Sequence, residues 1–235
     1  MKKIHWFAGI ILGFSIIVAL LITSFEIAMY SDFDVYRQEY EKYDVLSDLD
    51  MTMDDVMYVT HEMMDYLRGE GDTLSVMTTV EGKEQDFFNE QDRFHMGEVR
   101  DLFIGGLNIR LGACAAAVLC VLFLLFTRAD IKKIIPRSYR IALGMTGAAV
   151  LLIGIAAVVD FNAVFVQFHH IFFDNDLWIF DPAEDYMIRM LPEGLFYDMV
   201  MRIGAIFVAG LAVLLVLSFI PKILDRKKEI SMTYN

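Results

Sequence analysis

Cysteine is scarce in this chain of 235 residues, which contains two, Cys114 and Cys120. Both lie in the same long apolar run, and their six-residue spacing on one helix does not let them pair with each other. No cysteine lies in the polar segments of the chain. The sequence therefore excludes a disulfide-stapled domain, a cysteine nucleophile and a thiolate metal cluster in those segments.

The short motifs of several enzyme classes are also missing. The sequence has no G-x-S-x-G elbow, no phosphate-binding loop and no dinucleotide fingerprint. The serines of the polar segments, Ser31, Ser47 and Ser75, have no supporting motif around them. The sequence HEMMD at His61 ends in Asp65, where the H-E-x-x-H zinc motif requires histidine. His61 is therefore interpreted as an ordinary helix-surface residue.

Positive charge is rare in the two longer polar segments. Residues 31–103 contain 20 acidic and 6 basic side chains, a net charge of −14, and residues 160–200 contain 8 acidic side chains and one arginine, a net charge of −7. Such segments do not favour binding to nucleic acid or passive adhesion to anionic lipid. A solvated acidic surface explains most of this charge.

Long apolar runs dominate the rest of the chain, of which 57% is hydrophobic. Four nearly uncharged runs, residues 6–25, 107–127, 141–159 and 203–220, are each long enough to cross a hydrocarbon layer of about 30 Å as a helix. The first run has no small-x-small cleavage site before Glu26, so it is interpreted as an uncleaved anchor rather than a signal peptide.

Basic residues predict the orientation of these spans. Eleven of the twenty lysines and arginines lie before the first span, between the second and third, or after the fourth. The positive-inside rule places those three segments, and so both termini, in the cytoplasm. We predict an α-helical integral membrane protein of four transmembrane helices, with a small extracytoplasmic α+β domain inserted between helices 1 and 2. The predicted boundaries are 1–30 for the N-terminal tail and helix 1, 31–103 for the α+β segment, 104–127 for helix 2, 128–140 for a cytoplasmic loop, 141–160 for helix 3, 161–200 for an interfacial segment, 201–220 for helix 4 and 221–235 for a cytoplasmic tail.

The first outer segment has clear signals of secondary structure. Thr52 and Asp55 form an acidic capping box, and Gly69 is a plausible stop for the helix that follows it. Residues 73–88 read as a hairpin that turns at EGKE. Asn89 with Asp92 then starts a helix that carries His95 towards the second span.

The second outer segment contains FHHIFFDNDLWIFDP, residues 168–182. On a helical wheel His169 flanks an apolar face and His170 points almost opposite to it. Asp181 and Glu184 suggest the cap of a short helix. The apolar face is expected to lie in the membrane interface and consists of Phe161, Val164, Phe165, Phe168 and Phe172.

His95 and His169 are expected at the same depth, the outer membrane boundary, and histidine is the usual general acid or base near neutral pH. Two other interpretations use the same residues. The histidines could be interfacial polar tips among aromatic anchors such as Trp178. They could also bind zinc together with one carboxylate. Depth alone does not decide between these uses.

Two motifs give the whole chain a resemblance to the bacterial lipoprotein intramolecular transacylase family. The first has an acidic residue three before a His-Met pair, followed by an acidic-Val pair. The second is Phe-His-x-Ile-Phe-Phe-x-Asn-Asp-x-Trp followed by Asp-Pro, and it selects His169 rather than His170. At two positions this chain keeps the charge of the family's acid but changes its length, with Asp92 in place of Glu and Glu98 in place of Asp. The matching residues are Asp92, His95, Met96, Glu98, Val99, Phe168, His169, Ile171, Phe172, Phe173, Asn175, Asp176, Trp178, Asp181 and Pro182.

The resemblance implies an acyltransferase that moves the sn-2 acyl chain of a diacylglyceryl lipoprotein to the α-amine of its N-terminal cysteine. Its partners would be that lipoprotein and membrane lipid, with no nucleic acid, cofactor or metal. Either histidine could be the base; the other would stabilise the oxyanion or protonate the leaving alkoxide. The alternative is a non-enzymatic membrane protein that binds a lipid or a partner at the outer leaflet. The expected supporting residues are Asn175 as a hydrogen-bond donor, Asp176 as an orienting acid, Trp178 and Asp92.

Overall fold

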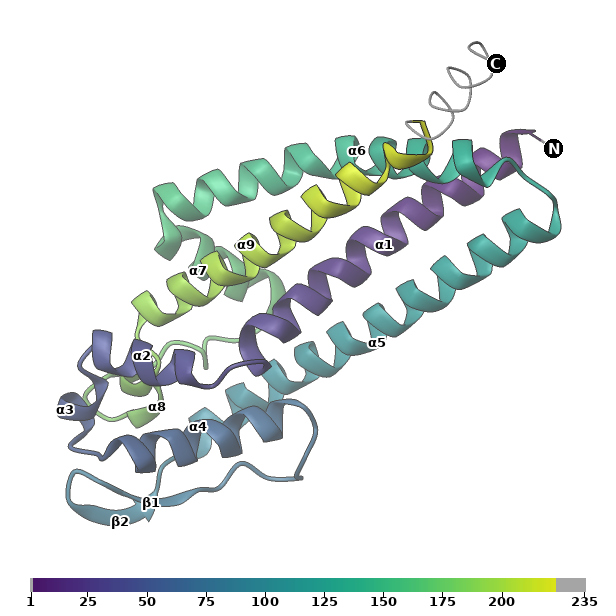
Figure 1. Cartoon of the computed structure of the whole chain (residues 1–235). Coiled ribbons are helices and arrows are strands. Elements are labelled where there is room, and N and C mark those ends of the chain that lie inside the picture. The colour runs from purple at the N-terminus through teal and green to yellow at the C-terminus, as the bar shows by residue number, and fades with distance from the viewer. Residues whose placement is uncertain (1, 223–235) are drawn as a thin grey trace. The chain divides into compact units, whose positions relative to one another are not determined.

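The computed structural model describes residues 2–222, so residue 1 and residues 223–235, most of the predicted cytoplasmic tail, lie outside the described residues. The chain divides into two compact units. The apolar unit comprises Met1–Glu26, Asn108–Ile155 and Ile203–Asn235, and the acidic unit comprises Ile27–Leu107 and Ala156–Arg202. The described elements, labelled in Figure 1, are α1 (Lys2–Tyr30), α2 (Asp34–Lys42), α3 (Val45–Leu49), α4 (Met53–Leu67), β1 (Met77–Val80), β2 (Lys83–Asp86), α5 (Glu90–Phe126), α6 (Ile131–Val159), α7 (Phe161–Phe172), α8 (Tyr186–Met190) and α9 (Glu193–Leu217).

Four helices within residues 2–222 are long and apolar enough to cross a membrane. They are Lys2–Tyr30, Glu90–Phe126, Ile131–Val159 and Glu193–Lys222. The helical character and the number of predicted spans are therefore confirmed. The helices are longer than the apolar runs that revealed them: the first turns of α5 carry several charged side chains and precede the apolar run that begins at Leu107.

Helix α6 also begins early, at Ile131, so it takes up most of residues 128–140, which the sequence predicts as a loop. Pro136 lies inside this helix. It is the sixth residue of α6 and lies beyond the first four N–H groups, which have no intrahelical partner in any helix, so it leaves the Lys132 carbonyl without its usual intrahelical donor while the helix continues. The basic residues of this stretch therefore extend a span instead of forming a separate loop.

Close helix contacts in the apolar unit depend on small side chains. Gly9 and Gly13 of α1 face Ser138 and Ala142 of α6, and a Cβ at either glycine would overlap these neighbours. Small residues at a four-residue spacing let membrane helices approach closely. The Tyr139 hydroxyl of the same α6 segment donates to the Leu211 carbonyl of α9, at 3.0 Å.

The helix and hairpin predicted in the acidic unit are confirmed. Thr52 caps α4 by accepting from the Asp55 N–H at 3.2 Å, and Gly69 follows the helix with φ +88°, a value that favours glycine. Strands β1 and β2 pair antiparallel, with Val80 opposite Lys83. Both turn residues, Glu81 and Gly82, have positive φ, as a two-residue hairpin turn requires.

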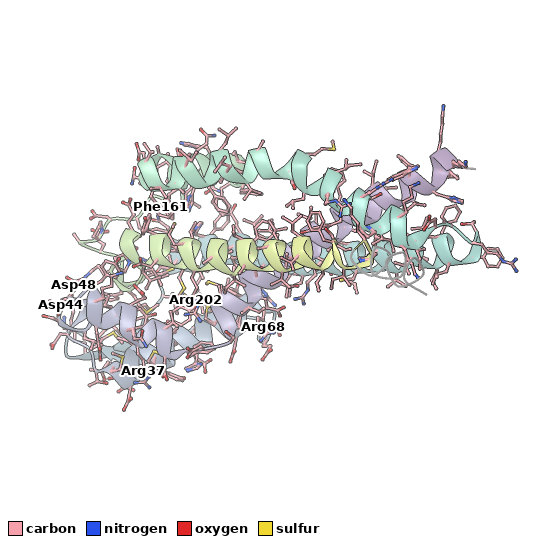
Figure 2. The ribbon with its side chains drawn as sticks, turned by 45° about the horizontal axis from the view of Figure 1, so that its top comes forward. Arg37, Asp44, Asp48, Arg68, Phe161 and Arg202 are labelled. Carbon is pink, nitrogen blue, oxygen red and sulfur yellow. The ribbon has the colours of Figure 1, made fainter. Side chains whose placement is uncertain are left out.

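The core of the acidic unit lies between α2, α3, α4 and the hairpin and includes residues of α5, α8 and α9. Tyr36 and Tyr40 of α2 are fully buried in it, and the Tyr40 hydroxyl lies 2.6 Å from the Thr60 hydroxyl of α4. Arg189 of α8 donates to Asp48 of α3, labelled in Figure 2, at 2.9 Å and to Glu81 of the hairpin turn at 2.7 Å. Residues 160–200 are thus bound to residues 31–103.

The predicted helix cap at Asp181 is wrong. Helix α8 begins five residues later, after Asp185, and residues 181–185 form a turn. The Asp181 carboxylate accepts from the Ala183 N–H at 2.9 Å, and the Asp181 N–H donates to the Asp185 carboxylate at 2.9 Å. Aspartate stabilises such turns as readily as helix starts, so the D-x-x-E pattern alone did not separate the two.

Candidate active site

Helix α5 presents His95 in its second turn because the start of the helix is fixed by two side chains. The Asn89 N–H donates to the Asp92 carboxylate, and the Asp92 N–H donates to the Asn89 side-chain oxygen, each at 2.9 Å. This reciprocal pair is a capping box. Asp92, predicted as a supporting residue, is therefore a fully buried helix cap one turn before His95.

Helix α7 presents His169 near its C-terminal end. Asp160 caps the helix by accepting from the Ala163 N–H at 3.0 Å, just before Phe161, which is labelled in Figure 2. The Nδ1 atom of His169 lies 2.7 Å from the Phe165 carbonyl oxygen. A carbonyl only accepts, so Nδ1 carries the proton and Nε2 of the neutral ring is left as the basic nitrogen.

The two imidazoles lie together, as predicted from their shared depth. The centroids of His95 and His169 are 5.9 Å apart with the rings nearly parallel, at 26°. Both side chains are buried, at 6% and 7% exposure. Aromatic rings surround them: Phe173 contacts both imidazoles, Phe180 contacts His95, and Phe165 and Trp178 contact His169.

Burial keeps both imidazoles neutral. His95 precedes the apolar run of α5, and burial together with the nearby His169 lowers its pKa from 6.5 to about 4. Burial also lowers the pKa of His169, partly opposed by the hydrogen bond to the Phe165 carbonyl. Two free imidazoles can accept a proton at neutral pH, which is the requirement for a general base.

Glu98 is the acid beside His95, and no role in the site was predicted for it. Its Oε2 atom lies 3.9 Å from Nδ1 of His95, and both atoms are buried without a hydrogen-bond partner. Its Oε1 atom accepts from the Asn175 side chain at 2.8 Å. The signal was present: a residue three positions after His95 shares its helical face.

The loop of residues 173–185 is fastened to α5 along its length. Asn175 donates to Glu98, and the Gln91 side chain donates to the carbonyls of Leu177 and Ile179, each at 3.0 Å. At the far end of the loop Asn89 donates to Asp185. These contacts bring the two sequence motifs together.

The other three predicted supporting residues, Asn175, Asp176 and Trp178, differ from one another in their contacts. The Asn175 amide is already bonded to Glu98, so it orients that acid. Asp176 is exposed, and no hydrogen bond within residues 2–222 joins its carboxylate to either imidazole. Trp178 lies against His169, with ring centroids 4.7 Å apart, and its Nε1 is buried without a partner.

Residues outside this cluster agree with the plain interpretations given to them. His170 is exposed, and its ring meets the edge of Trp178. His61 is exposed and stacks on Phe33, with centroids 4.2 Å apart. Among the described residues no three His, Cys, Asp or Glu side chains are placed to hold a metal ion. The site residues therefore do not form the donor set that a zinc site needs.

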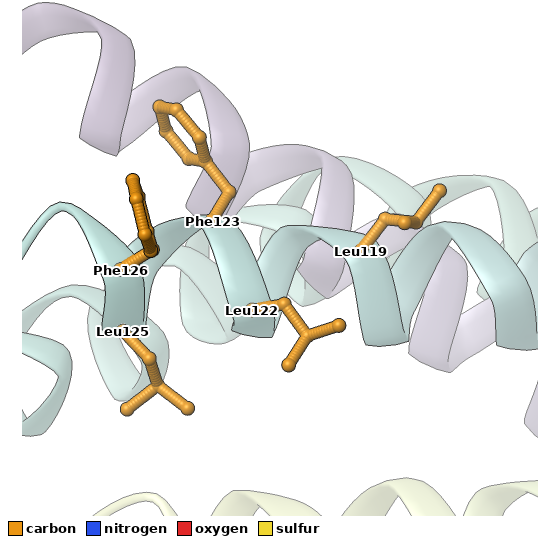
Figure 3. A pocket seen from close by; sticks show the side chains of 5 residues that line it. All are labelled: Leu119, Leu122, Phe123, Leu125 and Phe126. Atoms are coloured by element: carbon orange, nitrogen blue, oxygen red, sulfur yellow. The ribbon is translucent and has the colours of Figure 1, made fainter.

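A separate apolar depression lies on the last turns of α5 (Figure 3). Leucine and phenylalanine side chains alone line it, so it offers no acid, base or hydrogen-bond donor for chemistry. Such a surface suits lipid chains. Its lining residues are Leu119, Leu122, Phe123, Leu125 and Phe126.

Comparisons with known proteins match both the sequence and the fold of this chain. The family model described as lipoprotein intramolecular transacylase Lit matches residues 10–196. The fold is similar to the membrane integral lipoprotein intramolecular transacylase Lit from Bacillus cereus, with a TM-score of 0.79 and 20% identity over 97% of this chain and 100% of that chain. Two further structures of that protein, with one histidine replaced by arginine or by alanine, have TM-scores of 0.73 and 21% identity; they cover 98% and 97% of this chain and 96% and 97% of their own. Curated protein sequences include no match to the chain. With its family match over most of its length and four helices able to span a membrane, this multi-pass chain belongs to the lipoprotein intramolecular transacylase family.

Proposed function

We propose that this protein moves the sn-2 acyl chain of a diacylglyceryl-modified lipoprotein to the α-amine of the lipoprotein's own N-terminal cysteine, leaving a lyso-form lipoprotein. The observation that carries the proposal is the pair of neutral, buried imidazoles 5.9 Å apart. The substrate supplies both the nucleophile and the ester. The enzyme then needs only to bring them together and to move protons.

His95 and His169 are the proposed catalytic residues. A free imidazole takes a proton from the attacking amine, and the resulting imidazolium gives a proton to the departing glycerol oxygen. Nε2 of His169 is the reacting atom on that ring, because Nδ1 is held by the Phe165 carbonyl. The aromatic rings around the pair exclude water, which would otherwise hydrolyse the ester.

The outer segments of the chain face away from the cytoplasm in this proposal, and both termini face the cytoplasm of a bacterial cell. The distribution of basic residues supports this orientation. The site is then at the outer leaflet, where the lipid-modified terminus of a lipoprotein is anchored. Membrane lipid and the diacylglyceryl lipoprotein are the proposed partners.

The test is mass spectrometry of a reporter lipopeptide incubated with the purified protein in lipid. Transfer within one molecule leaves the mass unchanged, so fragment ions must show the acyl chain on nitrogen instead of glycerol. Two reporters with acyl chains of different lengths are mixed to detect exchange between molecules. N-acylated product without exchange supports the proposal; binding of the reporter without any transfer would favour the non-enzymatic alternative.

A further inference from the structure

Two buried acceptor atoms without partners face the same point of the site. They are Oε2 of Glu98 and, in the tautomer protonated at Nε2, Nδ1 of His95; they lie 3.9 Å apart. A hydrogen bond between them would need a distance of about 3 Å, so they do not satisfy each other. Buried polar atoms are nearly always paired, and two exceptions side by side point to a ligand that completes them.

The ligand must donate at least two hydrogen bonds from one small group. A tetrahedral nitrogen that donates to two acceptors at about 2.9 Å holds them about 4.7 Å apart, close to the spacing seen here. An ammonium group has three such donors, and a carboxylate is its natural counter-ion. A hydroxyl group has a single O–H donor, so it cannot donate to both acceptors.

We propose that Glu98 binds the α-ammonium group of the substrate's N-terminal cysteine and holds it against Nδ1 of His95. This inference rests on the proposed function and names the group that the site selects. Asn175 orients the carboxylate by its 2.8 Å hydrogen bond to Oε1, which leaves Oε2 for the substrate. The Glu98 side chain is 29% exposed, so it lies at the edge of the site, where a ligand can reach it.

The neighbouring acids do not compete for this role. Asp92 accepts the Asn89 N–H through Oδ2, and its Oδ1 is buried without a partner; Asp176 is exposed. Among the described residues, no ion pair or hydrogen bond joins either acid to an imidazole, as the close approach of Glu98 to His95 does. Glu98 is therefore the carboxylate that lies beside His95. A lipoprotein whose cysteine is already N-acylated has no ammonium group, and the site rejects it by leaving Oε2 unpaired.

The proton balance also fits an ammonium substrate. The new C–N bond forms as the ester C–O bond breaks, and the nitrogen goes from three protons to the one of the amide. His95 takes the first proton from the ammonium, which frees the lone pair for attack, and His169 takes the second. One proton ends on the glycerol oxygen and the other is released to solvent.

A pair of lipopeptides isolates binding from reaction. In both, the glyceryl chains are joined by ether bonds, so no acyl group can transfer. One has a free α-amine and the other is N-acetylated. The full-length wild-type protein in lipid is expected to bind the free amine roughly 10- to 100-fold more tightly, the effect of a hydrogen bond between charged groups.

Glu98→Gln keeps the shape of the side chain and its contact with Asn175 but removes the charge. It should bind both lipopeptides about as weakly as wild type binds the N-acetylated one. Glu98→Asp should keep part of the preference. Asp101→Asn, which removes an exposed charge from the same helix, is the control and should keep all of it.

Three outcomes overturn the inference. The first is a wild-type protein without a preference for the free amine, and the second is a Glu98→Gln variant that keeps the preference. The third is a preference that persists unchanged well above pH 8, where an α-amine with a pKa of about 7.7 to 8.0 loses its charge. The last measurement uses wild type alone and is independent of the folding of any variant. Acyl transfer to the reporter lipopeptide distinguishes the two levels: transfer without an amine preference defeats this inference and leaves the proposed function standing.

Discussion

His169 offers the sharpest test of the proposed chemistry, because its two ring nitrogens have separate surroundings. Nδ1 donates to the Phe165 carbonyl at 2.7 Å, and Nε2 is left to exchange protons. His169→Asn keeps an N–H close to the position of Nδ1 and removes Nε2. His169→Gln reaches towards the position of Nε2 and loses the donor at Nδ1. Neither amide can act as a base.

Both variants should therefore lose activity by roughly 10² to 10⁴, the usual contribution of a general acid or base. Their stabilities should differ. Both lose the ring contacts with Phe165 and Trp178, but only the glutamine variant also loses the bond to the Phe165 carbonyl, a difference of about 1 kcal/mol. In a chain of this size that difference lowers the Tm by about 2 to 4 °C.

The assay is the initial rate of N-acylation of the reporter lipopeptide, with thermal unfolding measured on the same samples. His170→Gln is the matched control: this neighbour is exposed, and its ring meets the edge of Trp178, so most activity should remain. A His169→Asn variant that keeps more than about a tenth of the wild-type rate would show that Nε2 is not the reacting atom. Equal losses at positions 169 and 170 would show that the helical face was assigned wrongly.

Four further predictions follow from the same site. Burial lowers the pKa of His169 below 6.5 and that of His95 to about 4, so both imidazoles stay unprotonated as the pH falls. The value of kcat should therefore stay unchanged to below pH 6.5. A fall in kcat with its midpoint at or above pH 6.5 would contradict this. Replacing Ser31, Ser47 and Ser75 together by alanine should leave the rate near wild type, since Ser31 and Ser75 donate to Ile27 and Asp86 and none belongs to the histidine cluster; an acylated enzyme peptide in the mass spectrum would refute direct transfer. Chelators should have little effect on the rate, and recovery of a chelated sample on adding zinc would defeat the two-histidine mechanism. Gly194→Ala should lower stability by about 1 to 3 kcal/mol, because its Cβ would overlap the Tyr43 ring; an unchanged Tm would show that the ring moves aside freely.

Local patterns in the sequence predicted what depends on neighbours along the chain. The start of α4 at Thr52, the turn at Gly82 and the different faces of α7 on which His169 and His170 lie all depend on residues a few positions apart. Such features follow from helical periodicity, capping and the φ that a tight turn demands. They were confirmed for that reason.

Local sequence patterns could not predict the long-range contacts that assemble the site. Asn175 and Glu98 are 77 residues apart, and Asn89 and Asp185 are 96 apart. No local rule states which amide meets which acid over such distances. Asp181 shows the same difficulty on a smaller scale: its carboxylate could cap a helix or close a turn, and the hydrogen bond from its own N–H to Asp185 decided for the turn.

The crowding of histidines and aromatic rings in residues 168–182 has a physical cause in this arrangement. Phe168 and Phe172 of α7 remain exposed, at 45% and 51%, as suits side chains that meet lipid, while His169 on the adjacent face is buried. Beyond the helix, Phe173 and Trp178 turn back and contact the His169 ring. One short segment thus supplies an exposed apolar surface and the apolar wall that keeps an imidazole neutral. An imidazole acts as a base only while it is unprotonated, so the apolar aromatic side chains around His169 help to keep it in the form that the proposed reaction needs.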